Sequence, residues 1–303
     1  MKSRHSVINI LAVLFVLPLT APLVRGAITI DVLSTFDYPG VGNSTLPQKI
    51  NDRGDIAGYY IDSSGVTRGF VRFRDGTFSA PIVEPNDTAG ATQVRGINNL
   101  RTVCGTDHRT DNTTHGFFLA HNTFTDFDVP DALNTYVWSL NDAGDFCGRT
   151  DLLAGGNPGF ISIGGNLVLF VVPGSEGFNE AFGMNNSDQI AGTYFDGAGT
   201  GHGFFRDADG TFISPIDPPD SVDTSLFGLN DQKWMVGRYV DDAGITHALV
   251  AASPARFIAF DYPGATFTSF NGINRQGLIC GRYQDSSGVG HGILARVRRM
   301  PAD

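Results

Sequence analysis

One segment recurs six times along this chain, and this repetition constrains the fold more than any other feature. The copies align on an asparagine that follows an apolar residue, and successive asparagines are 47, 43, 44, 45 and 44 residues apart. They are Asn51, Asn98, Asn141, Asn185, Asn230 and Asn274. A period of this length is typical of one blade of a β-propeller.

Two further positions keep their distance from the asparagine. Glycine stands seven residues later in every copy, and we expect it to permit close packing of the blades. Seventeen residues after the asparagine the copies have Arg68, His115, Pro158, His202, His247 and His291. Because the histidines recur once per unit, a ring would spread them apart instead of gathering them around a metal, so we expect them to be structural.

Each unit reads as four short strands joined by Asn-, Asp- and Gly-rich turns. The asparagine strand is predicted to be innermost, "DIAGYY" second, "HGFF" third, and a strand ending in proline, such as "FDYP" at 260–263, outermost. The last unit lacks its proline strand, and "TFDYP" at 35–39 can supply it. The sequence therefore predicts an all-β, six-bladed β-propeller of four-stranded blades, closed by the N-terminal strand pairing into the last blade.

Composition supports this fold class and excludes one class of partner. Only three of the 31 acidic residues are glutamate and only three of the 21 basic residues are lysine, so strong helix formers are scarce. The formal net charge is -10. Nucleic-acid binding needs a basic stripe, and the only basic cluster is "RVRRM" near the C-terminus, so we expect no nucleic-acid partner.

The first 26 residues have the features of a secretory signal peptide: basic residues, an apolar run and then small residues before a cleavage point. An uncleaved signal anchor is the alternative. We expect residues 1–26 to be removed, 27–298 to form the propeller and 299–303 to be a tail. The protein would be secreted or periplasmic, monomeric and without a membrane span after cleavage.

The three cysteines Cys104, Cys147 and Cys280 occupy one repeat position, six residues after the asparagine. Equivalent positions on different repeats are usually too far apart for a disulfide. We expect three buried free thiols that pack as small apolar residues.

The units "GINRQGLICGRYQDSSGVGHGIL" and "MNNSDQIAGTYFDGAGTGHGFF", followed by "FDYPGA", resemble the bacterial extracellular repeats of the HAF family, named for a His-Ala-Phe-like triplet. The resemblance covers roughly residues 36–295. It implies export and a repeat architecture, and it transfers no catalytic residue. This chain departs from the triplet at Arg68 and Pro158, and elsewhere it mostly has His-Gly-Phe.

If repetition marks the scaffold, function is expected where the copies differ. The loops 86–96, 106–114, 131–139 and 174–183 surround one end of the predicted channel. Four residues there are candidate ligand contacts: Arg95, Tyr136, Trp138 and Glu180. Aromatic rings stack on the apolar faces of sugars, so we expect a binding module for an extracellular polysaccharide or a protein partner.

A secreted hydrolase or lyase is the alternative. Its candidate catalytic residues are Asp107, His108 and Arg109, which supply a base, an acid and an anion clamp, together with Glu180, which could act as one carboxylate of a pair. A purely structural surface component is a third possibility. "RDADG" at 206–210 has some features of a calcium loop but lacks the remaining oxygen ligands, so turn formation is favoured and no cofactor is expected.

Overall fold

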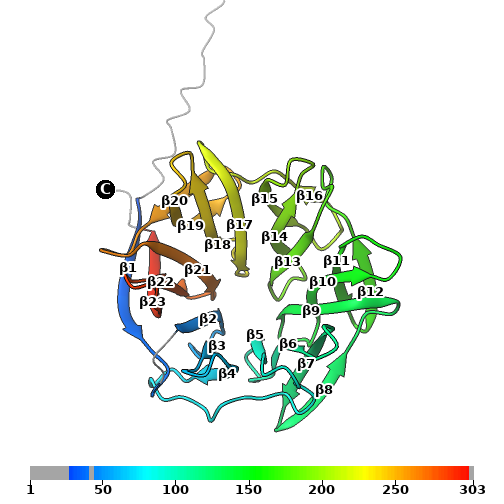
Figure 1. The fold of residues 1–303 in the computed structure, drawn as a ribbon. Coiled ribbons are helices and arrows are strands. Elements are labelled where there is room, and N and C mark those ends of the chain that lie inside the picture. The colour runs from blue at the N-terminus through cyan, green and yellow to red at the C-terminus, as the bar shows by residue number, and fades with distance from the viewer. Residues whose placement is uncertain (1–26, 41–43, 300–303) are drawn as a thin grey trace, which may run out of the picture.

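The computed structural model describes residues 27–40 and 44–299, and the secondary structure of these residues is made of strands and turns. The strands are arranged around a central axis, as the blades of a β-propeller are (Figure 1). The predicted signal peptide and residues 300–303 of the predicted tail lie outside the described residues. Arg299, which was assigned to that tail, belongs instead to a strand.

The order of strands from the axis outward agrees with the prediction. The strands nearest the axis are β2 (Ser44–Ile50), β5 (Gln93–Ile97), β9 (Ala132–Leu140), β13 (Asn179–Met184), β17 (Ser221–Leu229) and β21 (Phe267–Ile273). The second strands are β3 (Ile56–Ile61), β6 (Val103–His108), β10 (Phe146–Leu152), β14 (Ile190–Phe195), β18 (Met235–Asp241) and β22 (Leu278–Gln284). The third strands are β4 (Thr67–Arg72), β7 (Thr114–Ala120), β11 (Gly159–Ile163), β15 (Gly201–Arg206), β19 (Thr246–Ser253) and β23 (Gly290–Arg299).

The outermost strands are β8 (Thr123–Phe127), β12 (Asn166–Phe170), β16 (Phe212–Ile213), β20 (Arg256–Phe260) and β1 (Ile28–Phe36). They end before the prolines that were expected to close them. The segment "IVEP" at 82–85 was predicted as an outer strand and forms none. Only isolated bridges, Gly69 to Ile82 and Arg72 to Phe78, hold that edge, so the β2–β3–β4 sheet has three strands instead of four.

Hydrogen bonding groups these strands into five sheets, and not into the six separate ones expected. Three sheets have four strands and one has three. The remaining sheet has eight strands because a single parallel bridge, Thr114 to Asn134, connects β7 to β9. The count of sheets therefore does not by itself give the count of blades.

The N-terminal strand closes the ring. β1 pairs antiparallel with β23, with Ile28 opposite Arg299 and Phe36 opposite Gly292, in a sheet of order β1-β23-β22-β21. This confirms that the two ends of the chain join in the last sheet. The pairing begins at residue 28, earlier than the predicted 35–39.

The repeated asparagines form the turns at one end of the channel and link neighbouring turns. The Asn51 side-chain oxygen accepts from the backbone N–H groups of Arg53 and Asp55, and its amide donates to the Asn98 carbonyl at 3.0 Å. The chain of links closes where the Asn274 amide donates to the Asn51 carbonyl at 2.9 Å. Asn141 departs from the pattern and donates to Asp188 of the next turn. The asparagine thus forms its turn and also helps to close the ring.

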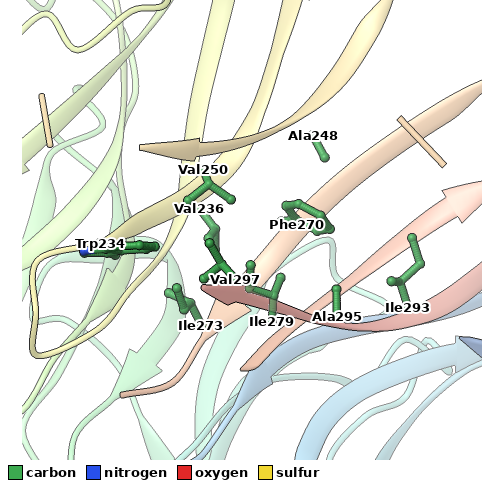
Figure 2. Close-up of a cluster of buried hydrophobic side chains, with 10 residues drawn as sticks. All are labelled: Trp234, Val236, Ala248, Val250, Phe270, Ile273, Ile279, Ile293, Ala295 and Val297. Carbon is green, nitrogen blue, oxygen red and sulfur yellow. The ribbon is translucent and has the colours of Figure 1, made fainter. Parts of the chain in front are cut away.

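Apolar side chains between neighbouring sheets supply the core. In one cluster, Val236 and Val250 from the β17–β20 sheet meet Phe270, Ile279 and other residues from the last sheet (Figure 2). Each sheet is too small to bury both faces alone, so contact with its neighbours stabilises it. This is the physical reason that the repeats form a ring.

The repeated glycine lies opposite a β-bulge. In each of the six inner strands the register slips by one residue just before the asparagine. At each slip a carbonyl of the inner strand presses on the glycine of the second strand, so close that a Cβ there would overlap it. The glycine therefore makes room for the bulge within its own sheet. A close approach was expected at this position, but between neighbouring blades, and that part of the expectation was wrong.

We predict that Gly148→Ala lowers the free energy of unfolding by about 3 kcal/mol or more, because the new methyl group collides with the Tyr136 carbonyl and the Phe160 ring. The control is Gly155→Ala, in a turn with open space around the new methyl, where only the cost of a positive φ of 91° remains. Urea unfolding of both variants measures this. Equal losses would contradict the role given to Gly148.

Candidate functional site

A cavity of about 170 Å³ lies on the axis of the ring. Residues of the inner strands and of the second strands line it: Leu46, Gln48, Lys49, Tyr59, Arg95, Trp138, Phe182, Phe227, Arg238, Phe267, Ser269, Asn271 and Arg282. At the asparagine end of the channel lies a separate hollow of about 70 Å³, lined by the turn residues. The cavity of about 170 Å³ is therefore on the side away from the asparagine turns.

The β-bulges supply half of the cavity wall. The residue three positions before each repeat asparagine lies within the bulge, and in all six copies it lines the cavity. These bulge residues are Gln48, Arg95, Trp138, Phe182, Phe227 and Asn271. β-Bulges commonly redirect a side chain beside a functional site. Here the same backbone irregularity aims six different side chains at one space.

The four predicted ligand contacts lie together. The Trp138 indole donates from Nε1 to Glu180 Oε2 at 2.9 Å, and the Tyr136 and Trp138 rings stack with centroids 5.5 Å apart. The Arg95 guanidinium lies 4.6 Å from the Trp138 ring. Arg95 and Trp138 line the cavity, whereas Tyr136 and Glu180 lie behind them.

Glu180 is held by a residue that the sequence did not suggest. Arg149 Nε lies 3.3 Å from Glu180 Oε1, and the same guanidinium covers the Tyr136 ring at 4.1 Å. Burial raises the pKa of Glu180, and the charge of Arg149 and the Trp138 hydrogen bond only partly offset that effect. Arg149 also pairs with Asp151, with Nη1 3.2 Å from Oδ1. Glu176, the nearby glutamate in sequence, is exposed beside Gly197.

The cavity wall is cationic. Lys49, Arg95, Arg238 and Arg282 line it, and none of its lining residues is acidic. Removal from water is the main reason that the pKa of Lys49 falls to about 8, and the charge of the nearby Arg95 makes a small contribution in the same direction. Burial also lowers the pKa of Arg282, with smaller contributions in the same direction from Arg238 and Arg95. The arrangement suits a ligand that carries negative charge.

Hydrogen bonds and ion pairs do not bring all four predicted catalytic residues together within the described residues. The buried Asp107 carboxylate pairs with Arg109 at 3.1 Å, and Arg109 extends to Asp126 on the outer strand β8 at 3.3 Å. His108 points to Thr114, with Nδ1 2.9 Å from Oγ1. Burial raises the pKa of Asp107 and lowers that of His108. Within residues 27–40 and 44–299, no hydrogen bond or ion pair joins Glu180 to these three residues.

The repeated histidines bind carboxylates of their own sheets, as a structural role requires. His202 Nδ1 lies 2.7 Å from Asp217 and His247 Nδ1 lies 2.9 Å from Asp261. His115 and His291 make the same contact with Asp128 and Asp37. Each histidine thereby ties the third strand to the end of the outer strand.

The aspartates of "RDADG" are engaged in turn formation. Asp207 Oδ1 accepts from Gln189 Nε2 at 2.9 Å and from the Ala208 N–H, and Asp209 Oδ1 accepts from the Thr211 N–H. In the described part of the chain there is no group of three or more His, Cys, Asp or Glu residues that could hold a metal ion. Residues 27–40 and 44–299 also contain no helix with the length and apolarity that crossing a bilayer demands.

Cys104, Cys147 and Cys280 are buried and unpaired, as predicted. Burial raises the pKa of Cys147 and of Cys280 to about 12. Thiols in such surroundings are unreactive, since the thiolate is the nucleophile.

Several cavity residues escaped sequence reasoning: Gln48, Lys49, Tyr59, Phe227, Arg238, Phe267, Asn271, Arg282 and, beside them, Arg149. The signal was present in the repeat alignment. Three residues before the asparagine and eight residues after it, the copies differ in size and charge, and both positions lie within strands.

Comparison with solved structures supports the fold class. A putative TolB from Agrobacterium tumefaciens is 11% identical, with 92% of this chain and 99% of that chain covered and a TM-score of 0.55. An Aleuria aurantia lectin mutant in complex with Fucα1-6GlcNAc is 9% identical, with 86% and 97% covered and a TM-score of 0.53. TolB from Acinetobacter baumannii (12% identity, TM-score 0.48) is a longer chain, of which 56% is covered against 84% of this one. At these identities the likeness to the first two structures shows the all-β propeller fold alone.

No family model matches the sequence, and no curated protein does.

We predict that Lys49→Met raises the free energy of unfolding at pH 7 by on the order of 1 kcal/mol, because the folded protein disfavours the charged amine. The lysine pKa is about 8 in the folded chain and is ordinarily 10.5. The parent protein therefore gains stability as the pH rises from 8 to 10.5, and the advantage of the variant shrinks over that range. Urea unfolding at pH 7 and pH 10 measures the difference.

Lys233→Met is the control for loss of a lysine, since Lys233 is exposed and lies outside the cavity. An advantage of Lys49→Met that stays constant from pH 7 to pH 10 would contradict the effect of charge burial.

Proposed function

We propose that this protein is a secreted β-propeller that binds extracellular polysaccharide in the axial cavity. The observation that carries the proposal is the ring of bulges, which directs six side chains of five kinds into one space on an otherwise repetitive scaffold. A scaffold that needed only to close would gain nothing from that variety.

The chemistry of the wall suits a sugar. Trp138, Phe182 and Phe227 form a run of ring contacts, with centroid separations of 5.6 and 5.1 Å. Gln48 and Asn271 add amides that can donate to and accept from hydroxyl groups. Five of the thirteen lining residues are aromatic, and a small-molecule site usually combines such rings with a few well-placed polar groups. A cavity of about 170 Å³ accommodates one sugar unit or a chain end.

The propeller fold is compatible with this activity, because a lectin of similar fold has been solved with a bound disaccharide. Counting the blades by their asparagine turns instead of by their sheets gives six, and six bulged inner strands support this count. The HAF-type repeats and the apolar N-terminal segment support export, to the periplasm or to the medium. A partner protein at the same face is the competing binding function.

The two tryptophans of the chain allow a direct test. Trp138 lies in the cavity wall and Trp234 lies in a core cluster away from it. With Trp234→Phe, Trp138 is the only tryptophan, and we expect its emission, excited at about 295 nm to avoid the tyrosines, to change on titration with a panel of neutral and acidic oligosaccharides. With Trp138→Phe, the emission of Trp234 should not respond.

Trp138→Ala should weaken binding of the responsive sugars by roughly tenfold, since it removes both the stacking surface and the support of Glu180. An absence of binding to every sugar in the panel, with both variants folded by circular dichroism, would overturn the proposal. Release of shorter sugars during the titration, measured by reducing-end assay, would instead favour the hydrolase.

A further inference from the structure

The charge of the cavity is opposite to the charge of the protein. The chain carries a formal net charge of -10, yet the titratable groups along the cavity wall are Lys49, Arg95, Arg238 and Arg282, together with the Tyr59 phenol. Like charges gathered in a partly buried space repel one another, and burial also removes them from water. A group of this kind reduces stability unless an anion joins it.

The protein supplies no carboxylate for three of these cations. Within the described residues, Lys49, Arg238 and Arg282 form no ion pair with an aspartate or glutamate. Arg238 Nε is buried and has no hydrogen-bond partner there. Glu180, which lies behind the wall, is paired with Arg149 and hydrogen bonded to Trp138. Arg95 donates to the neutral side chains of Gln48 and Gln93.

The orientation of the arginines is fixed by rings. The Arg282 guanidinium lies 4.7 Å from the Phe267 ring, and Arg238 lies between Phe267 at 5.7 Å and Phe227 at 5.9 Å. A guanidinium that stacks on an aromatic ring has its N–H groups free at the edge of the guanidinium plane. Two of these N–H groups can donate to the two oxygens of a carboxylate. Lys49 supplies a further positive charge at the same wall.

We infer that the cavity binds the carboxylate of an acidic sugar, such as a uronic acid unit, on Lys49, Arg238 and Arg282. The inference rests on the proposed polysaccharide-binding function and names its ligand class. The aromatic bulge residues across the cavity then contact the apolar face of the sugar ring. Bare phosphate or sulfate shares the anionic chemistry but has no surface for Trp138 and Phe182 to cover.

The test uses two ligands with the same sugar chain, hexagalacturonate and its fully methyl-esterified form, in which each carboxylate is replaced by an uncharged methyl ester. Isothermal titration with the full mature chain should show that the acid form binds at least about tenfold more tightly than the ester. Arg238→Gln should remove most of this difference by weakening the acid form alone. Arg238→Lys keeps the positive charge but loses the paired N–H donors of the guanidinium, so it should retain part of the preference for the acid form.

The matched control for net charge is Arg53→Gln, since Arg53 is exposed at the asparagine end of the channel. It should leave both affinities unchanged. Lys49→Met and Arg282→Gln provide independent variants if Arg238→Gln fails to fold by circular dichroism. Each should weaken binding of the acid form and spare the ester.

Each result decides between the two levels of the proposal. Equal binding of the acid and ester forms, or tighter binding of the ester, overturns the acidic ligand and leaves the polysaccharide-binding function standing. No binding of any sugar overturns both. Inorganic phosphate that binds as tightly as hexagalacturonate would identify a simple anion site and would also overturn the inference.

Discussion

The contact between a backbone carbonyl and a glycine is the constraint on which the rest of this structure depends. In every copy the inner strand bulges so that its carbonyl rests on the glycine of the second strand, where a side chain would not fit. The bulge twists the inner strand and turns one side chain toward the axis. One invariant residue therefore serves both the geometry of the sheet and the position of the cavity wall, although it never touches the cavity itself.

Repetition explains why the site lies on the axis. Residues repeated around a ring are far from one another when they lie away from the axis, as the histidines of the third strands do, each bound to the aspartate of its own sheet. Only positions on the inner part of each sheet converge. Such a position is free to vary in each copy, because its backbone is fixed by the glycine opposite and by the asparagine turn below. The scaffold is thus symmetric and the site is not.

The sequence predicted the strand order, the closure by the N-terminal strand and the free thiols, because these follow from repeated spacing and composition. It also placed Trp138 and Glu180 at the same end of the channel. It failed for "IVEP", where only isolated bridges formed, and for Asp107 and Arg109, whose side chains pair with each other and with an outer strand. The bulge decides which side chains of the inner and second strands face the axis. No local pattern of apolar and polar residues reveals a bulge, so Lys49 and Arg238 were not predicted to line the cavity.

The cavity cations show how function can be separated from stability in such a protein. Lys49 stands where the other copies have glycine or serine, and burial disfavours its charge. A residue that costs stability and forms no ion pair within the described fold is not explained by the scaffold. The ring tolerates the cost because its strength comes from contacts distributed between sheets and from its closure by β1. The free-energy cost of the charges at the axis is then offset by contacts between all the sheets of the ring. The inner wall can therefore carry buried charges that a small core could not accommodate.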